Sequence, residues 1–208
     1  MGENLKYRNF TNTLNMSAEQ TLQLFRETEA LLKGHFQLTS GLHSPQYFQC
    51  AQVLQHPQHA ETLCRVAQQH FSKQKIDVVI APAVGGIIVA HEVGRLLQAR
   101  VLFAERQEGK MSLRRGFHIS PGEKVLVCED VITTGGSVRE VIALAREAGG
   151  EVVGAFCIVD RSSGKADFGV PLISTLQLAP ETYQPEKCPL CAAGSKAEKP
   201  GSRFLKRG

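Results

Sequence analysis

The chain has no tryptophan, and aromatic residues make up only 6% of its 208 positions. It also lacks any apolar run near the roughly 20 residues that a membrane-spanning helix needs. The polar first 15 residues contain no apolar segment of the kind found in signal peptides. We therefore expect no membrane association and a cytoplasmic location.

Several catalytic and nucleotide-binding motifs are missing as well. The sequence contains neither G-x-x-x-x-G-K-[ST] nor a G-x-G-x-x-G after an apolar run, which argues against phosphate-loop hydrolysis and dinucleotide binding. The H-E-x-x-H and G-x-S-x-G patterns are absent too, which argues against zinc proteases and serine hydrolases. With 24 basic and 20 acidic residues, the net charge of +4 suits a small anionic substrate and does not call for nucleic acid.

Six cysteines are present, and four of them stand alone within apparent secondary structure, as expected for reduced, buried thiols: Cys50, Cys64, Cys128 and Cys157. Cys188 and Cys191 have the spacing of half a zinc site. No second pair lies nearby in the sequence, so a complete site would need ligands from a partner subunit, and two free thiols are the alternative.

Apolar strand-like runs alternate with helical patterns from residue 57 onward. Such alternation predicts an α/β fold with a mostly parallel sheet flanked by helices. We divide the single domain into an N-terminal arm (1–16), a hood (17–56), a core (57–180) and a C-terminal tail with the cysteine pair (181–208). Within the hood, a capping box formed by Ser17 and Gln20 should start a helix that Gly34 can close, and two short strands should follow.

The most informative stretch runs from residue 125 to 142. It begins as a buried strand, continues with Glu129 and Asp130, and ends in a loop rich in hydroxyls and glycines: Thr133, Thr134, Gly135, Gly136 and Ser137. Ser137 and Glu140 form a second capping box, which predicts that a helix begins there. A glycine loop before a helix binds anions through backbone amides, so this loop should hold a phosphate.

The acid pair beside this loop narrows the ligand. Carboxylates accept hydrogen bonds from vicinal hydroxyls and repel a second phosphate, so a ribose 5-phosphate fits both features. A plain turn with two solvated acids is the alternative. At other strand ends, Val84, Gly85 and Gly86 expose backbone amides, and Arg161 offers a planar fork for a carboxylate.

Two further segments belong to the candidate site. Tyr47 and Phe48 could cover a flat base, although aromatics in short strands are as often part of a core. The segment 105–120 is predicted to be a long functional loop, because five cationic or titratable side chains would otherwise have no purpose there: Arg106, Lys110, Arg114, Arg115 and His118. A solvated run of charges is the alternative.

The stretch 127–137 resembles the phosphoribosyl pyrophosphate signature of type I phosphoribosyltransferases. Over roughly residues 20–205 the chain is similar to the orotate phosphoribosyltransferases of that family, in the bacterial branch with a Cys-Pro-x-Cys tail. Segment 36–48 resembles the hood of these enzymes, and segment 158–161 resembles their base-recognition loop. The tail around Cys188 resembles the tail of that bacterial branch.

This resemblance implies a glycosyltransferase of pyrimidine biosynthesis that uses orotate and phosphoribosyl pyrophosphate (PRPP). It implies Mg²⁺ held mainly through the pyrophosphate, and a homodimer whose lid reaches the neighbouring active site. It makes residues 84–86 the pyrophosphate loop and assigns the orotate carboxylate to Arg161. Glu129 and Asp130 would orient the ribose, and Arg106 and Lys110 would contact the pyrophosphate, with Lys110 neutralising or protonating the leaving group.

The chain departs from better-known members of the family at two places. They carry a lysine in the pyrophosphate loop and another in the hood, where this chain has Val84 with Gly85, and Thr39. We interpret this departure as a trait of the branch and not as a loss of activity. Two alternatives stay open: a purine phosphoribosyltransferase on the same scaffold, which would give Arg161 no carboxylate to bind, and a regulatory PRPP-binding protein without catalysis, which the missing lysines favour.

Overall fold

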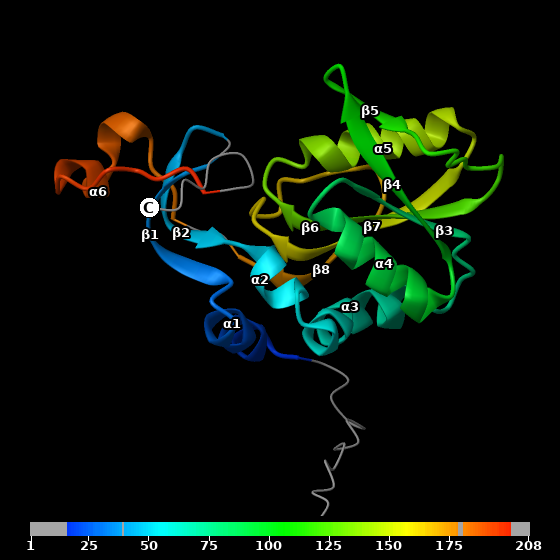
Figure 1. The fold of residues 1–208 in the computed structure, drawn as a ribbon, viewed down its shortest axis with the longest axis horizontal. Coiled ribbons are helices and arrows are strands. Elements are labelled where there is room, and N and C mark those ends of the chain that lie inside the picture. The colour runs from blue at the N-terminus through cyan, green and yellow to red at the C-terminus, as the bar shows by residue number, and fades with distance from the viewer. Residues whose placement is uncertain (1–15, 39, 179–180, 201–208) are drawn as a thin grey trace, which may run out of the picture.

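A computed structural model describes residues 16–38, 40–178 and 181–200. Its centre is a six-stranded sheet with the order β5-β4-β3-β6-β7-β8 (Figure 1). The strands are β3 (Val78–Pro82), β4 (Arg100–Gln107), β5 (Lys110–Leu113), β6 (Lys124–Ile132), β7 (Glu151–Asp160) and β8 (Leu172–Gln177). All neighbours pair in parallel except β4 and β5, so the predicted mostly parallel sheet is confirmed.

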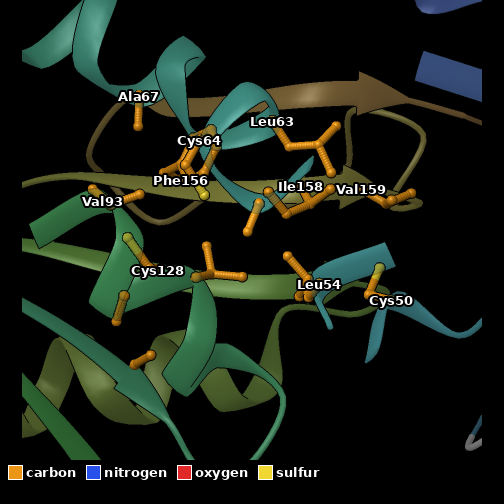
Figure 2. Packing of buried hydrophobic residues seen from close by; sticks show 14 of the residues in the cluster. Cys50, Leu54, Leu63, Cys64, Ala67, Val93, Cys128, Phe156, Ile158 and Val159 are labelled. Atoms are coloured by element: carbon orange, nitrogen blue, oxygen red, sulfur yellow. The ribbon is translucent and has the colours of Figure 1, made fainter. Parts of the chain in front are cut away.

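Helices cover both faces of this sheet. Side chains alternate along each central strand, so that Val79 and Leu126 face one core while Val78 and Val125 face the other. The first core packs against α3 (Pro57–Phe71) and α4 (Gly86–Leu97), and Figure 2 shows part of it. The second packs against α5 (Gly136–Glu147). Burial on both faces explains why these strands are continuous apolar runs in the sequence.

The hood forms a separate small layer beside the sheet (Figure 1). It contains α1 (Ala18–Glu27), a two-stranded antiparallel sheet of β1 (Leu31–Gln37) and β2 (His43–Phe48), and α2 (Cys50–Leu54). The tail adds the short helices η1 (Pro185–Lys187) and α6 (Pro189–Ala192). The tail is tied to the hood by backbone bonds: Gln37 donates to Glu198 at 2.7 Å, and His43 and Tyr183 exchange bonds of 2.9 Å. None of the described helices is long and apolar enough to cross a membrane.

The helix predicted at the start of the hood is partly confirmed. Both bonds of the capping box between Ser17 and Gln20 form. The helix ends at Glu27, however, and not at Gly34, because Glu29 adopts a left-handed backbone with φ of 54°. Leu31 and Leu32 share the seven-residue spacing of a helix with Leu24 and Phe25, but they lie in β1. The predicted arm 1–16, apart from Met16, lies outside the described residues, as does Thr39.

The long loop predicted for residues 105–120 is partly wrong, since only residues 114–120 lie outside regular structure and the hairpin turn. β4 extends to Gln107 and turns into β5 at Lys110, so the segment begins as a β-hairpin. Its two turn residues, Glu108 and Gly109, have φ of 49° and 85°. Two successive positive φ values are the geometry of the tight turns that match strand twist. We call β4, β5 and their turn the lid hairpin.

Candidate active site

The candidate site lies where the strand order reverses. The chain passes from β3 outward to β4 and then returns to place β6 on the other side of β3. In such sheets the carboxyl ends of the strands leave a crevice at this reversal. The loop after β3 and the end of β6 therefore meet there, and the end of β7 follows one strand further along.

The loop after β6 and the start of α5, residues 133–137, have the backbone geometry expected of an anion cradle. Gly135 has φ of 77°, a left-handed conformation that suits glycine, and α5 begins directly after it. The predicted helix start at Ser137 is one residue late, and its capping box is wrong, because no side chain caps this helix. The Glu140 carboxylate instead binds Arg106. The first-turn amides of α5 thus remain available to a ligand.

A cavity of about 330 Å³ opens over this cradle. All five loop residues named from the sequence line it, together with Glu129 and Arg106, and the remaining lining residues are Val131, Ile132, Val138 and Glu140. We call it the phosphate cavity.

Two neighbours that the sequence did not single out support the cradle. The Arg139 guanidinium donates to the Thr134 carbonyl at 2.7 Å and lies 5.3 Å from the centre of the Phe168 ring. The Phe168 ring fills the space where a side chain at position 135 would sit, 2.8 Å from an ideal Cβ. Both residues therefore contact the loop and support its conformation.

The two acids at the end of β6 differ in environment. Glu129 is buried, with 9% of its surface exposed, while Asp130 is partly exposed. Burial raises the pKa of the Glu129 carboxyl well above its ordinary value, and the neighbouring Asp130 charge raises it further. Each carboxylate also accepts a nearby backbone N–H, from Asp130 at 3.1 Å and from Val131 at 2.9 Å. These bonds fix the orientation of both carboxylates, and Glu129 lines the phosphate cavity.

The loop after β3 lies directly against these acids. An ideal Cβ at Gly85 would collide with the Asp130 carboxylate, and one at Gly86 would lie 3.1 Å from Glu129 Oε1. Glycine at both positions thus lets the backbone approach the carboxylates. Val84, in contrast, projects outward with 79% of its surface exposed.

Arg161 is the most unusual side chain at this rim. It is 8% exposed, yet its Nε and Nη2 atoms are buried and have no hydrogen-bond partner among the described residues. Its guanidinium lies 5.7 Å from the centre of the Phe48 ring, and burial lowers its pKa. A buried guanidinium without partners costs free energy unless a ligand pairs with it.

Two smaller cavities meet at Arg161. One of about 210 Å³ is lined by Tyr47, Phe48, Asp130 and Arg161, among others. The other, of about 280 Å³, adds the Ser162 and Lys165 side of the loop after β7. Thr133 lines both of them and the phosphate cavity, so the three adjoin. We call the two together the base cavity.

The two hood aromatics differ in their role at this cavity. Phe48 is 4% exposed and belongs to the core, where its ring meets Phe25 at 5.5 Å. Tyr47 is half-buried, and burial together with the Asp130 charge raises the pKa of its hydroxyl. Both residues line the smaller cavity at Arg161, and Phe48 belongs to the core as well.

The structure separates the predicted lid cations. Arg106 lines the phosphate cavity and pairs with Glu140. Lys110 is exposed in β5 and is not among the lining residues of the three cavities. Arg115 is paired with Glu105 at 2.8 Å, and His118 is exposed. In this conformation only Arg106 of the lid reaches the cavity.

The cysteine pair of the tail packs against the β1–β2 hairpin of the hood. Cys188 and Cys191 face His35 and His43 from β1 and β2. The expectation that a second ligand pair must come from a partner subunit is therefore wrong. No local spacing links these residues, since more than 140 positions separate the two pairs in the sequence.

Comparisons with known proteins agree with this geometry. Residues 49–168 match the model of the phosphoribosyl transferase domain. The chain is 57% identical to an orotate phosphoribosyltransferase from Desulforamulus reducens over 190 residues, which are 91% of this chain and all of that protein.

Among solved structures, orotate phosphoribosyltransferase from Aeropyrum pernix is similar, with a TM-score of 0.65 and 27% identity, over 75% of this chain and 92% of that one. An adenine phosphoribosyltransferase from Rhodothermus marinus shares the fold at 23% identity and a TM-score of 0.61, covering 76% and 99%. The fold alone therefore does not distinguish pyrimidine from purine enzymes. The family match and the relative at 57% identity show that the chain belongs to the phosphoribosyltransferase family, in its orotate phosphoribosyltransferase branch.

Proposed function

We propose that the protein transfers the 5-phosphoribosyl group of PRPP to orotate, giving orotidine 5′-monophosphate and pyrophosphate for pyrimidine biosynthesis. The observation that carries the choice of base is Arg161. Its buried guanidinium has two atoms without partners at the base cavity. Orotate brings a carboxylate that can accept from this planar fork, whereas adenine and hypoxanthine have none.

The donor fits the adjoining cavity. The first-turn amides of α5 and the hydroxyls of Thr133, Thr134 and Ser137 suit the 5-phosphate. Glu129 and Asp130 stand between the phosphate cavity and the base cavity, where the ribose would join the two ends. Their oxygens can accept hydrogen bonds from the ribose hydroxyls.

Electrostatics and positioning account for the catalysis. The anionic ring nitrogen of orotate forms a bond to the anomeric carbon while the bond from that carbon to the pyrophosphate oxygen breaks. Positive charge builds on the ribose during this exchange, and the Asp130 carboxylate beside it favours that charge. Tyr47 and Phe48 cover the base and exclude water that would hydrolyse the donor.

The leaving pyrophosphate needs cations. The backbone of Gly85 and Gly86 offers amides, and Arg106 already lines the phosphate cavity. Lys110 would reach the pyrophosphate only after a movement of the lid hairpin, and there it would neutralise or protonate the leaving group. Closure of the lid over the donor is thus part of the proposal.

Magnesium fits this site as a partner of the donor. Mg²⁺ prefers oxygen ligands and is usually held by substrate phosphates with one or two carboxylates. Among the described residues, Glu129 and Asp130 are the carboxylates at the end of β6, and Glu140 at the phosphate cavity is paired with Arg106. The pyrophosphate would therefore supply most ligands. When bound, the ion neutralises charge on the leaving group.

We further propose a cytoplasmic homodimer in which the lid hairpin of one subunit contributes to the active site of the other. The hairpin ends the sheet at edge strand β5, and its tip at Glu108, Gly109 and Lys110 is exposed (Figure 1). Sedimentation at low micromolar concentration should give the mass of two chains. A monomer with full activity would remove this part of the proposal.

A base panel tests the reaction. Pyrophosphate release should require PRPP, orotate and Mg²⁺ together, and it should be absent with adenine, hypoxanthine or guanine. Activity on a purine without activity on orotate would replace the proposal with a purine phosphoribosyltransferase. Saturable PRPP binding without pyrophosphate release on any base would indicate a regulatory binder.

A further inference from the structure

Four side chains with metal-binding atoms converge in the hood, away from the three cavities of the active site. Two come from the hairpin, His35 in β1 and His43 in β2, and two come from the tail, Cys188 before α6 and Cys191 within it. One ligand atom of each lies within 4.8 Å of the others. His35, His43 and Cys188 are buried, and Cys191 lies at the surface.

Four of the six separations between these atoms are close to the edges of a tetrahedron around zinc, and the other two are within 4.8 Å. His35 Nε2 lies 2.9 Å from His43 Nδ1, 3.5 Å from Cys188 Sγ and 3.7 Å from Cys191 Sγ. Cys191 Sγ lies 3.3 Å from His43 Nδ1. Ordinary Zn–N and Zn–S bonds at tetrahedral angles place two nitrogens about 3.3 Å apart and a nitrogen and a sulfur about 3.6 Å apart. The four atoms thus surround a space of the right size.

A further contact orients one of the rings. His35 Nδ1 lies 3.1 Å from the carbonyl oxygen of Ser195, so this nitrogen carries the proton and donates it. The Nε2 atom of the same ring then presents its lone pair to the cluster. Metal-binding histidines are commonly held in this way, with the second ring nitrogen bonded to a carbonyl or carboxylate.

The charge of the set also suits Zn²⁺. Two thiolates and two neutral imidazoles balance a divalent ion, so the loaded site would be neutral in a largely buried place. Without a metal, the two imidazoles and two thiols would be joined only by weak hydrogen bonds from S–H and N–H groups. Sulfur with nitrogen in a tetrahedral arrangement is the ligand type that zinc prefers.

We propose that the hood binds one structural zinc ion, held by four side chains: His35, His43, Cys188 and Cys191. The ion joins the tail to the β1–β2 hairpin, whose far end carries Tyr47 and Phe48 (Figure 1). All four ligand positions are filled by protein, as in zinc sites that stabilise folds and do not catalyse. The proposal concerns metal content and does not depend on which base the enzyme uses.

Metal analysis of the full-length protein, purified under reducing conditions without added metal, tests this directly. We expect about one zinc per chain, as closed four-ligand sites retain their ion. Cobalt should replace it after removal and produce the intense visible bands of a tetrahedral site together with thiolate-to-cobalt charge transfer. These spectra use the wild-type chain, so they do not depend on whether a variant folds.

Variants sharpen the test. Cys191→Ser changes the exposed ligand and should lower zinc content to less than about a fifth of the wild-type level, while Cys191→His, which keeps a ligand, should retain most of it. His59→Ala, which changes a histidine outside the cluster, should bind zinc normally. A wild-type chain that takes up neither zinc nor cobalt, or a disulfide between Cys188 and Cys191 in freshly purified protein, would overturn the proposal.

Discussion

Arg106 and Glu140 form a two-pronged ion pair that joins the lid hairpin to the second turn of α5. Arg106 Nη2 lies 3.0 Å from Glu140 Oε1, and Nη1 lies 2.9 Å from Oε2. Both side chains are about two-fifths exposed, so the pair contributes little to folding stability. Because Arg106 lines the phosphate cavity, pyrophosphate and Glu140 would compete for the same guanidinium in the proposed reaction.

This competition gives a first prediction. Arg106→Ala should lower kcat/KM for PRPP by about a hundredfold, because a charge that faces the leaving group is lost. Glu140→Gln should instead lower the KM for PRPP a few-fold, since it frees the arginine. Steady-state kinetics at several salt concentrations measure both. Equal losses in the two variants would show that the ion pair itself, and not the free arginine, serves catalysis.

Arg161 gives a second prediction, in which binding and stability change in different directions. Arg161→Met keeps much of the volume but removes a buried charge whose Nε and Nη2 have no partner. Orotate kcat/KM should fall by about a hundredfold or more, whereas thermal stability without ligand should stay level or rise. Lys165→Met, on the exposed side of the same cavity, is the matched control. A large drop in melting temperature would mean that Arg161 is structural.

The third prediction concerns pH. The raised pKa of Glu129 means that the folded protein binds this proton more tightly than the unfolded chain does. The contribution of Glu129 to stability is therefore largest below its unfolded pKa of about 4.3 and is lost as pH rises through the higher folded value. Glu129→Gln should be more stable than wild type at pH 8, and the difference should shrink toward pH 4.

Melting temperatures of both proteins across this range, with exposed Glu151→Gln as control, measure the effect. Asp77, Glu105 and Glu123 have pKa values lowered by hydrogen bonds and add the opposite slope. Both proteins contain them, so they cancel in the difference. A stability difference that does not change with pH would contradict the assignment of Glu129 as a buried, proton-retaining acid.

Gly85 gives a fourth prediction. Its backbone has φ of −58° and ψ of −42°, which any residue can adopt, and the three atoms nearest to an added Cβ all belong to the Asp130 carboxylate. Gly85→Ala should displace that carboxylate and reduce kcat about tenfold with little change in melting temperature. Asp130→Asn should cost more. Both substitutions act through the Asp130 carboxylate. The fold-loss of kcat in the double variant should therefore be smaller than the product of the two single fold-losses. A loss equal to that product would show that Gly85→Ala does not act through Asp130.

The zinc proposal and the proposed function together give a fifth prediction. Removing the metal should loosen the tail on the hairpin that carries Tyr47 and Phe48, because hydrogen bonds and packing alone would then join them, so the KM for orotate should rise several-fold. The KM for PRPP should change little, because the phosphate cavity belongs to the sheet and α5. Kinetics before and after chelation, with zinc added back, measure this. An equal change in both constants would indicate general unfolding.

Local patterns predicted the centre of the molecule well. Buried strands read as continuous apolar runs, and the glycine loop was correctly expected to lead into a helix, because both depend on neighbours in sequence. The errors arose where one pattern fits two structures. Leu31 and Leu32 continue a helical spacing but lie in a strand, since the left-handed Glu29 ends α1 before them.

Non-local pairings could not be read in this way. Ser137 and Glu140 have the spacing of a capping box, yet Glu140 binds Arg106 from a distant strand. The hairpin turn did have a local signal, because Gly109 occupies one of its two positions with positive φ. The second pair of metal ligands had no local signal at all, because only the folded hood brings His35 and His43 to the tail.

Because the other thiols are buried, the rate at which Cys191 is alkylated would report the zinc content of a preparation. Cys50, Cys64, Cys128 and Cys157 are between 0% and 2% exposed, burial raises their pKa values, and Figure 2 shows three of them within the core. Such thiols react slowly with alkylating reagents. Cys191 is the exposed one of the six cysteines, and a zinc-bound thiolate would be shielded. The rate at which a single thiol is labelled would then report, without any added probe, how many chains in a preparation carry zinc.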